Sequence, residues 1–350
     1  MIDTIKLFVP VPDPSLLAQL EGSLTRFRKE DLKTGEIKFE FFSSNIELGS
    51  YHRNVTIRST KVPAGLFVEF SIAKYEKGNN VEMIYPHDIP KIMEKLYSEL
   101  CTQVQYELPH FSLWPLYRLD ICYNWLLQNK EEALHAIDFI KRIDFPRKKK
   151  HVWDTSVMYQ GSAYIVKFYV KGPEFQKNDF KFIDAQSPDR AFQLAEYANK
   201  ILRFEVGLKR AYLMEYFGNN KVYLKDIADD LFIEEMLSVY LGKVFHYINT
   251  KTTTRAEVRR LLSENFSKTK ALRLYQFYRD YYFDEEMKAM YLQDGLNRST
   301  IYRYKKDLKR IGVGFSVGDS ELRKGILEQL IIPSSTTRFA LIDSPDTMPI

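Results

Sequence analysis

Apolar and polar residues alternate along much of the first 210 residues of the chain. A period of two that ends at polar turn residues is typical of β-strands with one buried face. We predict strands at Ile2–Val9, Ile37–Phe42, Asn54–Arg58, Leu66–Ile72, Val81–Tyr85, Tyr117–Tyr123, Thr155–Tyr159, Tyr164–Lys171 and Leu202–Lys209. A short turn such as Gln160-Gly161-Ser162 indicates a hairpin and hence antiparallel pairing.

Helical periodicity is found between some of these strands and takes over after about Tyr212. Helices are predicted after Asp88 (with Ile92, Met93, Leu96 and Leu100 on one face), at Lys130–Arg142 and at Asp189–Asn199, whereas the basic run 147–150 is expected in an exposed loop. The pattern predicts an α+β fold, with a largely antiparallel central sheet, flanking helices and a helical C-terminal module. We expect a sheet domain at residues 1–212, a helical DNA-binding domain at 213–315 and a tail at 316–350.

Composition narrows the class of protein. With 45% hydrophobic residues and only 15 Gly and 14 Pro in 350 residues, the chain is expected to be globular. It has no run of about 18 apolar residues, so no membrane span is predicted, and its N-terminus lacks the features of a secretion signal. Two isolated cysteines, Cys101 and Cys122, favour a reducing cytoplasm and argue against a cysteine zinc site.

Positive charge is concentrated in the predicted helical domain. The whole chain has a net charge of +5, but residues 251–312 alone contain fifteen Lys or Arg and eight Asp or Glu. A localised basic segment favours a polyanionic partner such as nucleic acid. A solvated basic helix surface would have the same composition.

Candidate chemistry lies on the strand predicted at Tyr164–Lys171. Alternation places Lys167, Tyr169 and Lys171 on the face opposite its apolar residues. The strands before and after it carry Asp120 and Glu205 on their own polar faces. If the three strands share a sheet, a tyrosine between lysines faces two carboxylates. This layout suits phosphoryl transfer with a tyrosine nucleophile and a metal ion.

The residue types explain the expected division of roles. A phenol with a pKa of about 10 is a weak nucleophile near neutral pH, and Lys167 and Lys171 supply cations beside it. Asp120 and Glu205 would hold Mg²⁺ or Mn²⁺, with Glu174 or Glu69 completing the site. Each strand alone is more typical of a structural role, because the chain has 23 tyrosines and cross-strand ion pairs are common.

A second pattern predicts a helix-turn-helix near the C-terminal end. A helix at 284–292 would end at Gly295, and Ser299 would cap a basic helix that buries Ile301, Leu308 and Ile311. Contacts to DNA are then expected from Ser299, Thr300, Arg303, Tyr304 and Lys306, with Lys167 contacting the DNA in the sheet domain. The alternative is an ordinary helical hairpin with a solvated basic face.

Other catalytic classes lack their motifs in this sequence. It contains neither a phosphate-binding P-loop nor a G-x-S-x-G nucleophile elbow. The six histidines show no metal-ligand spacing, and none has an Arg three residues later, which disfavours a tyrosine recombinase.

Five short motifs in the same order resemble the filamentous-phage replication initiators of the gene II/X type, and more weakly the trans-acting initiators of rolling-circle plasmids. They are Ser71-Ile72-Ala73-Lys74 with Gly78-Asn79-Asn80, Arg118-Leu119-Asp120-Ile121, Met158–Ser162 with Phe168–Glu174, Leu202–Val206, and Ser299–Lys306 with Leu308 and Gly312. The likeness spans most of residues 1–315. The paired-histidine metal motif of the wider superfamily is absent, so carboxylates would replace it.

The resemblance implies a specific activity. Tyr169 would nick one strand of a double-stranded origin and keep the 5′ phosphate, with Lys171 and Glu174 as supporting groups. The freed 3′-OH would prime a host polymerase, with a host helicase as a second partner, and the displaced single strand would later be rejoined. The work would take place in the host bacterial cytoplasm. The alternative is an origin-binding initiator or repressor that does not cut.

Overall fold

The computed structural model describes residues 1–30, 37–46, 55–143, 145, 147–245, 255–283 and 297–311, and the single positions 287, 290, 291, 293, 313, 330 and 332. The described residues divide into two units. The first contains the sheet (1–137 and 147–240) and residue 332, and the second contains helices within 241–331 together with 138–146. This division differs from the predicted boundary at residue 212. The reason is packing, since Tyr212 and Tyr240 both contact Tyr164 of the sheet.

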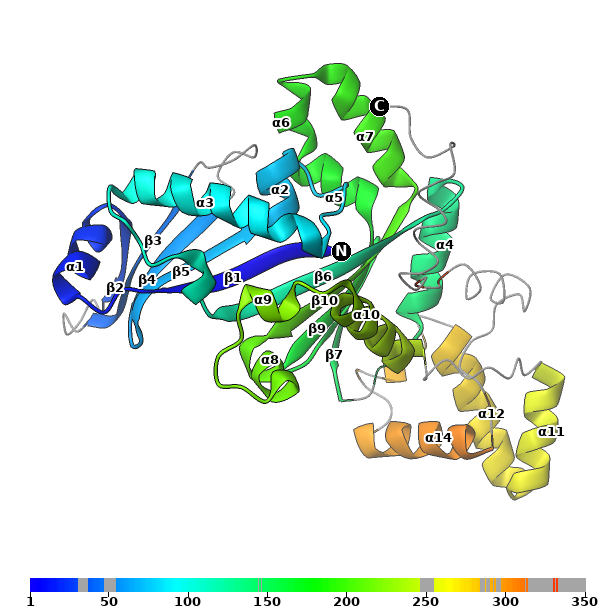
Figure 1. Cartoon of the computed structure of the whole chain (residues 1–350). Helices are drawn as coiled ribbons and strands as arrows, with labels where there is room; N and C mark the ends of the chain where they lie inside the picture. Colours follow the sequence, from blue (N-terminus) through cyan, green and yellow to red (C-terminus); the bar gives the residue numbers. More distant parts are fainter. Residues whose placement is uncertain are drawn as a thin grey trace. The chain divides into compact units, whose positions relative to one another are not determined.

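One antiparallel sheet of ten strands organises the first unit (Figure 1). The strands are β1 (Ile2–Pro10), β2 (Thr25–Glu30), β3 (Ile37–Ile46), β4 (Val55–Lys61), β5 (Ala64–Ser71), β6 (Leu116–Leu126), β7 (Lys149–Trp153), β8 (Ser156–Gln160), β9 (Tyr164–Val170) and β10 (Ile201–Lys209). Their order is β2-β3-β4-β5-β1-β6-β10-β9-β8-β7, and β1 and β6 run side by side through its middle. The predicted α+β class is confirmed.

Helices connect the strands and cover parts of the sheet. In the first unit they are α1 (Pro14–Gly22), α2 (Ile72–Lys77), α3 (Ile89–Val104), α4 (Lys130–Lys141), α5 (Lys171–Asn178), α6 (Phe180–Asp184), α7 (Pro188–Asn199), α8 (Arg210–Phe217), α9 (Leu224–Ile227) and α10 (Asp230–Phe245). Helices α4 and α10 each continue past the boundary between the units. No helix in the described part of the chain is long and apolar enough to cross a membrane.

The two faces of the sheet differ in chemistry because of the alternation seen in the sequence. Residues such as Leu119, Phe168 and Phe204 are fully buried on one face, which Tyr240 of α10 and Tyr75 of α2 help to cover. The other face, called the polar face below, carries Thr4, Lys6, Glu69, Arg118, Asp120, Lys167, Tyr169, Arg203 and Glu205, brought together by the strand register. One surface of one sheet therefore holds the predicted chemistry.

Two register shifts between β1 and β6 put extra residues onto the polar face. Pairing passes from Ile2 to Thr4 and skips Asp3, and on β6 it passes from Arg118 to Leu116 and skips Tyr117. An extra residue of this kind is a β-bulge, which re-aims a side chain that a regular strand would send to the other face.

Several boundaries differ from the predictions. The segment predicted as a strand at Val81–Tyr85 is a loop with a single bridge from Ile84 to Ile2. The basic run 147–150 is not all loop, because β7 begins at Lys149 and pairs with β8. Strands β5 and β9 end one residue earlier than predicted, as Ser71 accepts a hydrogen bond from Lys74 N–H and starts α2, and α5 starts at Lys171.

The second unit contains α11 (Arg255–Asn265), α12 (Lys268–Phe283) and α14 (Arg298–Arg310). Val258, Leu274, Phe277, Ile301 and Leu308 form its buried core. The predicted helix at 284–292 and Gly295 lie mostly outside the described residues, so the helix-turn-helix stays a prediction. Helix α14 is capped by Asn297, whose side-chain oxygen accepts from Ser299 N–H at 3.1 Å, and not by Ser299 as predicted.

Candidate active site

Tyr169 and Glu205 lie together on neighbouring strands of the polar face. In the β9–β10 register Lys167 stands opposite Glu205, and Tyr169 stands opposite Arg203. The Tyr169 hydroxyl donates to Glu205 Oε2 at 3.2 Å, and Lys167 Nζ contacts Oε1 at 2.5 Å. One carboxylate thus accepts from both the predicted nucleophile and a neighbouring cation.

Asp120 lies beside Glu205 on the next strand, where a glycine leaves room for it. Its register partner on β10 is Gly207, and a Cβ at Gly207 would stand 2.9 Å from Asp120 Oδ1. Asp120 is only 2% exposed, and Arg118 donates to both of its oxygens at 2.8 and 2.5 Å. Burial, followed by repulsion from Glu205, raises the pKa of Asp120 to about 7, although Arg118 and Lys167 act to lower it.

Lys171 and Glu174 occupy the first turn of α5 instead of the strand. Lys171 is fully buried, donates to Asn80 Oδ1 at 2.5 Å and forms an ion pair with Glu174. Burial, and then the charge of Arg203, lowers the pKa of Lys171. Its Nζ lies 5.8 Å from the centre of the Tyr169 ring. Lys171 therefore contacts the ring side of Tyr169 and holds Glu174.

Arg203 is the main residue of the site that the sequence reasoning did not single out. It is fully buried on the polar face, donates to Cys122 Sγ at 3.1 Å and places Nη1 3.8 Å from Asp3 Oδ1. Its Nε and Nη1 have no hydrogen-bond partner among the described residues. The signal was present in the sequence, because alternation places Arg203 on the same face as Glu205 two residues later.

This end of the polar face is covered, and we call it the buried end. Val81, Phe175, Ala198 and Ile201 form a small apolar cluster over it. Asn124 of β6 donates to the backbone oxygen of Val81 at 3.0 Å, which ties the 79–84 loop to the sheet.

Tyr169 is a protonated phenol in this arrangement. Burial raises its pKa well above the usual value near 10, and the charges of Glu205 and Glu174 raise it further. Arg203 provides the main opposing effect. The cation that lowers the pKa of Tyr169 most is thus Arg203, whereas the sequence suggested Lys167 and Lys171 for this role.

Two of the predicted metal ligands fit such a role. Asp120 and Glu205 repel each other, so a cation between them would relieve that repulsion. Mg²⁺ commonly binds one or two carboxylates and completes its shell with water and phosphate oxygens. Glu174 instead pairs with Lys171, and Glu69 pairs with Lys6 and Arg118. Within the described ranges, no group of three His, Cys, Asp or Glu side chains is placed to hold a metal.

Neither of two nearby tyrosines on the same strands shares the polar face. Tyr164 of β9 packs against Tyr240 with ring centres 4.5 Å apart, on the apolar face. Tyr159 of β8 is fully buried and pairs with Val166 in the register. Tyr169 is therefore the tyrosine of β8 and β9 that meets the carboxylates.

The predicted DNA contacts of α14 have different environments. Ser299, Arg303 and Lys306 are exposed, and Thr300 is half-buried. Tyr304 is half-buried because its ring packs on Phe277, with centres 5.2 Å apart. Tyr304 thus contributes to the core of the second unit, which the sequence pattern did not indicate.

Comparison with known protein families identifies the class to which the chain belongs. Residues 1–223 match the family described as the N-terminal part of the gene II replication-associated protein. This chain belongs to that family, which confirms the resemblance to gene II type replication proteins drawn from the motifs. The match ends at residue 223, before the helices from residue 241 onward, so the C-terminal part of the resemblance stays a prediction.

One solved structure is similar to the chain, a rolling circle replication initiator protein from Geobacillus stearothermophilus. The identity is 12% and the TM-score 0.30, over 70% of this chain and 84% of that one. No curated protein matches the chain.

Proposed function

We propose that this chain initiates rolling-circle DNA replication by nicking one origin strand and holding the 5′ phosphate on Tyr169. The observation that carries the proposal is the 3.2 Å hydrogen bond from the Tyr169 hydroxyl to Glu205, with Asp120 on the adjacent strand. Family membership supports a role in replication. A nucleophile, a proton acceptor and a second carboxylate on one face are the parts that the reaction requires.

The proposed step exchanges one phosphodiester bond for another. The Tyr169 oxygen bonds to phosphorus, the bond from phosphorus to the 3′ oxygen breaks, and the phenolic proton passes to Glu205 Oε2. The 3′ oxygen leaves, takes up a proton and becomes the 3′-OH that primes a host polymerase. Rejoining reverses the step after a second cleavage at the copied origin has freed the 3′-OH of the displaced strand. That hydroxyl attacks phosphorus, the bond to Tyr169 breaks, and the tyrosine oxygen takes a proton back from Glu205.

Neighbouring groups lower the barrier to this step. Arg203 and Lys167 stabilise negative charge as it develops on the tyrosine and on the phosphate. Lys171 fixes the start of α5 against Tyr169. Asp120 and Glu205 would hold Mg²⁺ or Mn²⁺, which when bound polarises the scissile phosphate and offsets its charge.

The exposed residues of α14 would find the origin duplex. Arg303 and Lys306 would contact phosphates or base edges, with Ser299 and Thr300 near the start of the helix. A host helicase would then unwind the duplex ahead of the polymerase in the host bacterial cytoplasm.

The test is incubation with supercoiled origin DNA and Mg²⁺ or Mn²⁺. We expect open circles with covalently attached protein, and none with Tyr169→Phe. Tyr164→Phe is the matched control, because it removes a hydroxyl from the apolar face of the same strand and should still nick. Mass spectrometry should map the phosphotyrosine to Tyr169. Binding without any nicking would instead make the chain a non-catalytic initiator or repressor.

A further inference from the structure

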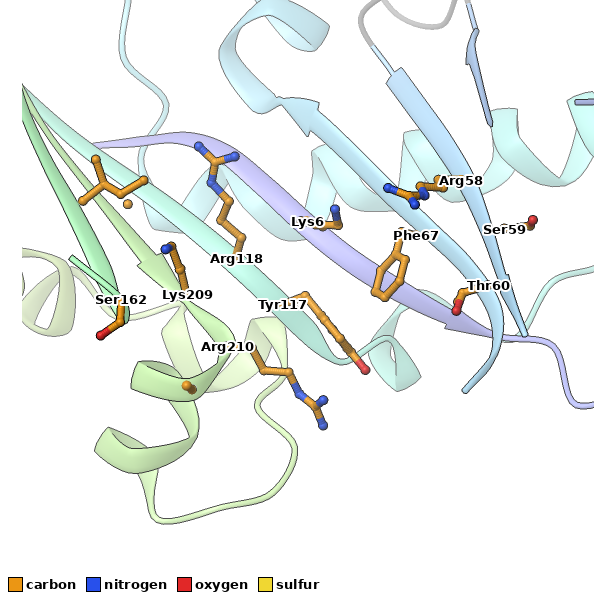
Figure 2. A pocket seen from close by; sticks show the side chains of 13 residues that line it. Lys6, Arg58, Ser59, Thr60, Phe67, Tyr117, Arg118, Ser162, Lys209 and Arg210 are labelled. Carbon is orange, nitrogen blue, oxygen red and sulfur yellow. The ribbon is translucent and has the colours of Figure 1, made fainter. Parts of the chain in front are cut away.

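An open pocket of about 640 Å³ lies on the polar face (Figure 2). In the register it is on the far side of Asp120 from Arg203 and the buried end, because Arg118 and Lys209, which line it, pair two positions beyond Asp120. Arg118, which donates to Asp120, and Gly207, the register partner of Asp120, both line it, so the pocket adjoins Asp120 directly. Its volume is within the range of pockets that enclose small-molecule-sized groups. We call it the open end of the polar face.

Cations dominate the lining of this pocket. Lys6, Arg58, Arg118, Lys209 and Arg210 line it, and none of the described residues that line it is acidic. Lys6 and Arg118 are already paired with Glu69. Arg58, Lys209 and Arg210 form no ion pair within the described part of the chain, so the pocket favours an anionic group.

Aromatic rings lie between these cations. Phe67 and Tyr117 are in edge-to-face contact with centres 4.8 Å apart, and both are half-buried. The Arg210 guanidinium lies 4.5 Å from the centre of the Tyr117 ring, and Lys6 Nζ lies 5.0 Å from that of Phe67. Figure 2 shows the two rings between Arg210 on one side and Lys6 and Arg58 on the other.

The β-bulge on β6 is what brings Tyr117 here. Tyr117 and Arg118 are consecutive, yet both line the pocket, whereas consecutive residues of a regular strand point to opposite faces. The skipped pairing at Tyr117 allows the exception.

The first turn of α8 adds to the positive character. Arg210 and Ala211 at its start line the pocket. Lys209 stands at the N-cap and makes no capping hydrogen bond, since a lysine side chain has no acceptor. The partial positive charge of the helix start therefore reinforces the side chains that line the pocket.

We propose that this pocket binds an unpaired nucleotide of the origin strand beside the scissile phosphate. The phosphates on either side of this nucleotide would lie against Lys209 and Arg210 and against Arg58. Its base would stack on Tyr117, whose ring Phe67 supports edge-on. Base faces are hidden inside a duplex and become available only in single strands. The origin must then be opened at the nick site before cleavage. This inference rests on the proposed function.

The test measures binding to a fluorescent oligothymidylate of about 12 nucleotides and to a duplex of the same length. Tyr117→Leu should weaken single-strand binding about tenfold, because it removes a stacking ring. The triple variant Arg58→Gln/Lys209→Gln/Arg210→Gln should weaken it at least as much and lower the slope of log affinity against log salt by about 2. Affinity for the duplex should change less than about twofold in both variants, because we expect duplex binding to depend mainly on phosphate contacts of the exposed basic helix α14.

Controls separate the pocket from general charge and from folding. The triple variant Lys91→Gln/Lys130→Gln/Lys225→Gln removes the same charge from exposed residues outside the pocket and should retain most of the single-strand affinity. Thermal unfolding midpoints check that each variant folds. Unchanged single-strand binding in both pocket variants, or an equal loss of duplex binding, would overturn the proposal.

Tyr169→Phe distinguishes this inference from the proposed function. It should bind the oligothymidylate like the wild type while forming no covalent adduct. If the wild type never nicks but the pocket variants still lose single-strand binding, the proposed function fails and the pocket stands. If the wild type nicks and the pocket variants bind normally, only the pocket proposal fails.

Discussion

The two ends of the polar face hold their charges in opposite ways. At the buried end Arg203 and Lys171 have no exposed surface, and burial lowers the pKa of Lys171 and raises that of Tyr169. At the open end Arg58 and Arg210 are exposed and lie over aromatic rings. Asp120 and Glu205 lie between the two ends.

This difference in burial indicates which kind of function each end of the polar face suits. Charges removed from water interact strongly and have fixed positions, which favours bond-making chemistry. Exposed cations gain little from any single partner and exchange partners readily, which favours binding a flexible polyanion. Substitutions at the two ends should therefore differ in both size and kind of effect.

The largest effect is expected from Glu205→Gln. It removes the charge that accepts the Tyr169 proton, and loss of several kcal/mol of such stabilisation slows nicking about 10³-fold or more. Single-turnover formation of the covalent adduct measures it. Glu69→Gln, which affects the ion pairs of Lys6 and Arg118 near the open end, should cost less than about tenfold. A similar loss of nicking rate in both variants would contradict the proposal that the two ends of the polar face have different functions.

The second-largest effect is expected on stability, which should fall more for a substitution at the buried end than for one at the open end. Arg203→Met leaves the buried Asp3 carboxylate without its closest cation and should cost about 3 kcal/mol of unfolding free energy. This loss of unfolding free energy is at the lower end for a broken buried ion pair, because the charge of Lys171 also stabilises the Asp3 carboxylate. Arg58→Met, at the exposed end, should change stability by less than about 0.5 kcal/mol. Urea unfolding measures both, and equal changes would contradict the contrast.

A third expectation concerns pH and Asp120. The folded protein keeps a proton on Asp120 up to about pH 7, whereas an unfolded chain releases it near pH 4. Between these values the folded state binds more protons, so unfolding free energy falls as pH rises. Asp120→Asn should remove that slope and raise stability at pH 8 by about 4 kcal/mol, the equivalent of about three pKa units.

The control for this slope is an exposed carboxylate with the same substitution. Asp138→Asn, with a side chain 57% exposed, should leave the pH slope of unfolding unchanged. Denaturant titrations from pH 4 to 8 measure the three proteins. A wild-type slope that persists in Asp120→Asn would mean that other groups cause it.

The smallest effect is expected from a substitution in the second unit. Its basic residue Arg303 is exposed, like Arg58 and Arg210 at the open end of the polar face. Arg303→Gln should weaken duplex origin binding a few-fold and lower the salt slope by about 0.9, the value for one lost phosphate contact. Arg260→Gln on α11, already paired with Glu264, should change neither. Anisotropy titrations over a range of salt concentrations measure both variants. Equal slopes for Arg303→Gln and the wild type would remove Arg303 from the DNA contacts.

Alternation predicted the strands that carry the site, because a sheet with one buried face imposes a period of two on Val166, Phe168 and Val170. The same rule placed Tyr169, Asp120 and Glu205 on one surface. It failed where local hydrogen bonds decide the outcome, as at Ser71, which starts a helix. Alternation also did not predict the bulge at Tyr117. A skipped residue in the pairing of β1 with β6 depends on both strands and does not change the hydrophobic pattern of either one.

The partners of the charged residues were less predictable still. Asn80 and Arg203 join the site through contacts between segments far apart in the chain, as Asn80 meets Lys171. Sequence spacing carries no information about such pairs. Glu174 was expected with the carboxylates, but the helix that begins at Lys171 directs it to that lysine.

The strand order has a consequence for synthesis of the protein. Strand β1 pairs with β6, as Lys6 meets Arg118, and the carboxylate pair is complete only when β10 docks on β6. Pairing of strands this distant in sequence must first overcome a loop-closure entropy cost and is therefore slow. A nascent chain that has not yet reached Lys209 contains Tyr169 but no docked β10. The hydrogen bond from Tyr169 to Glu205 can therefore form only after β10 has been made and has paired with β9.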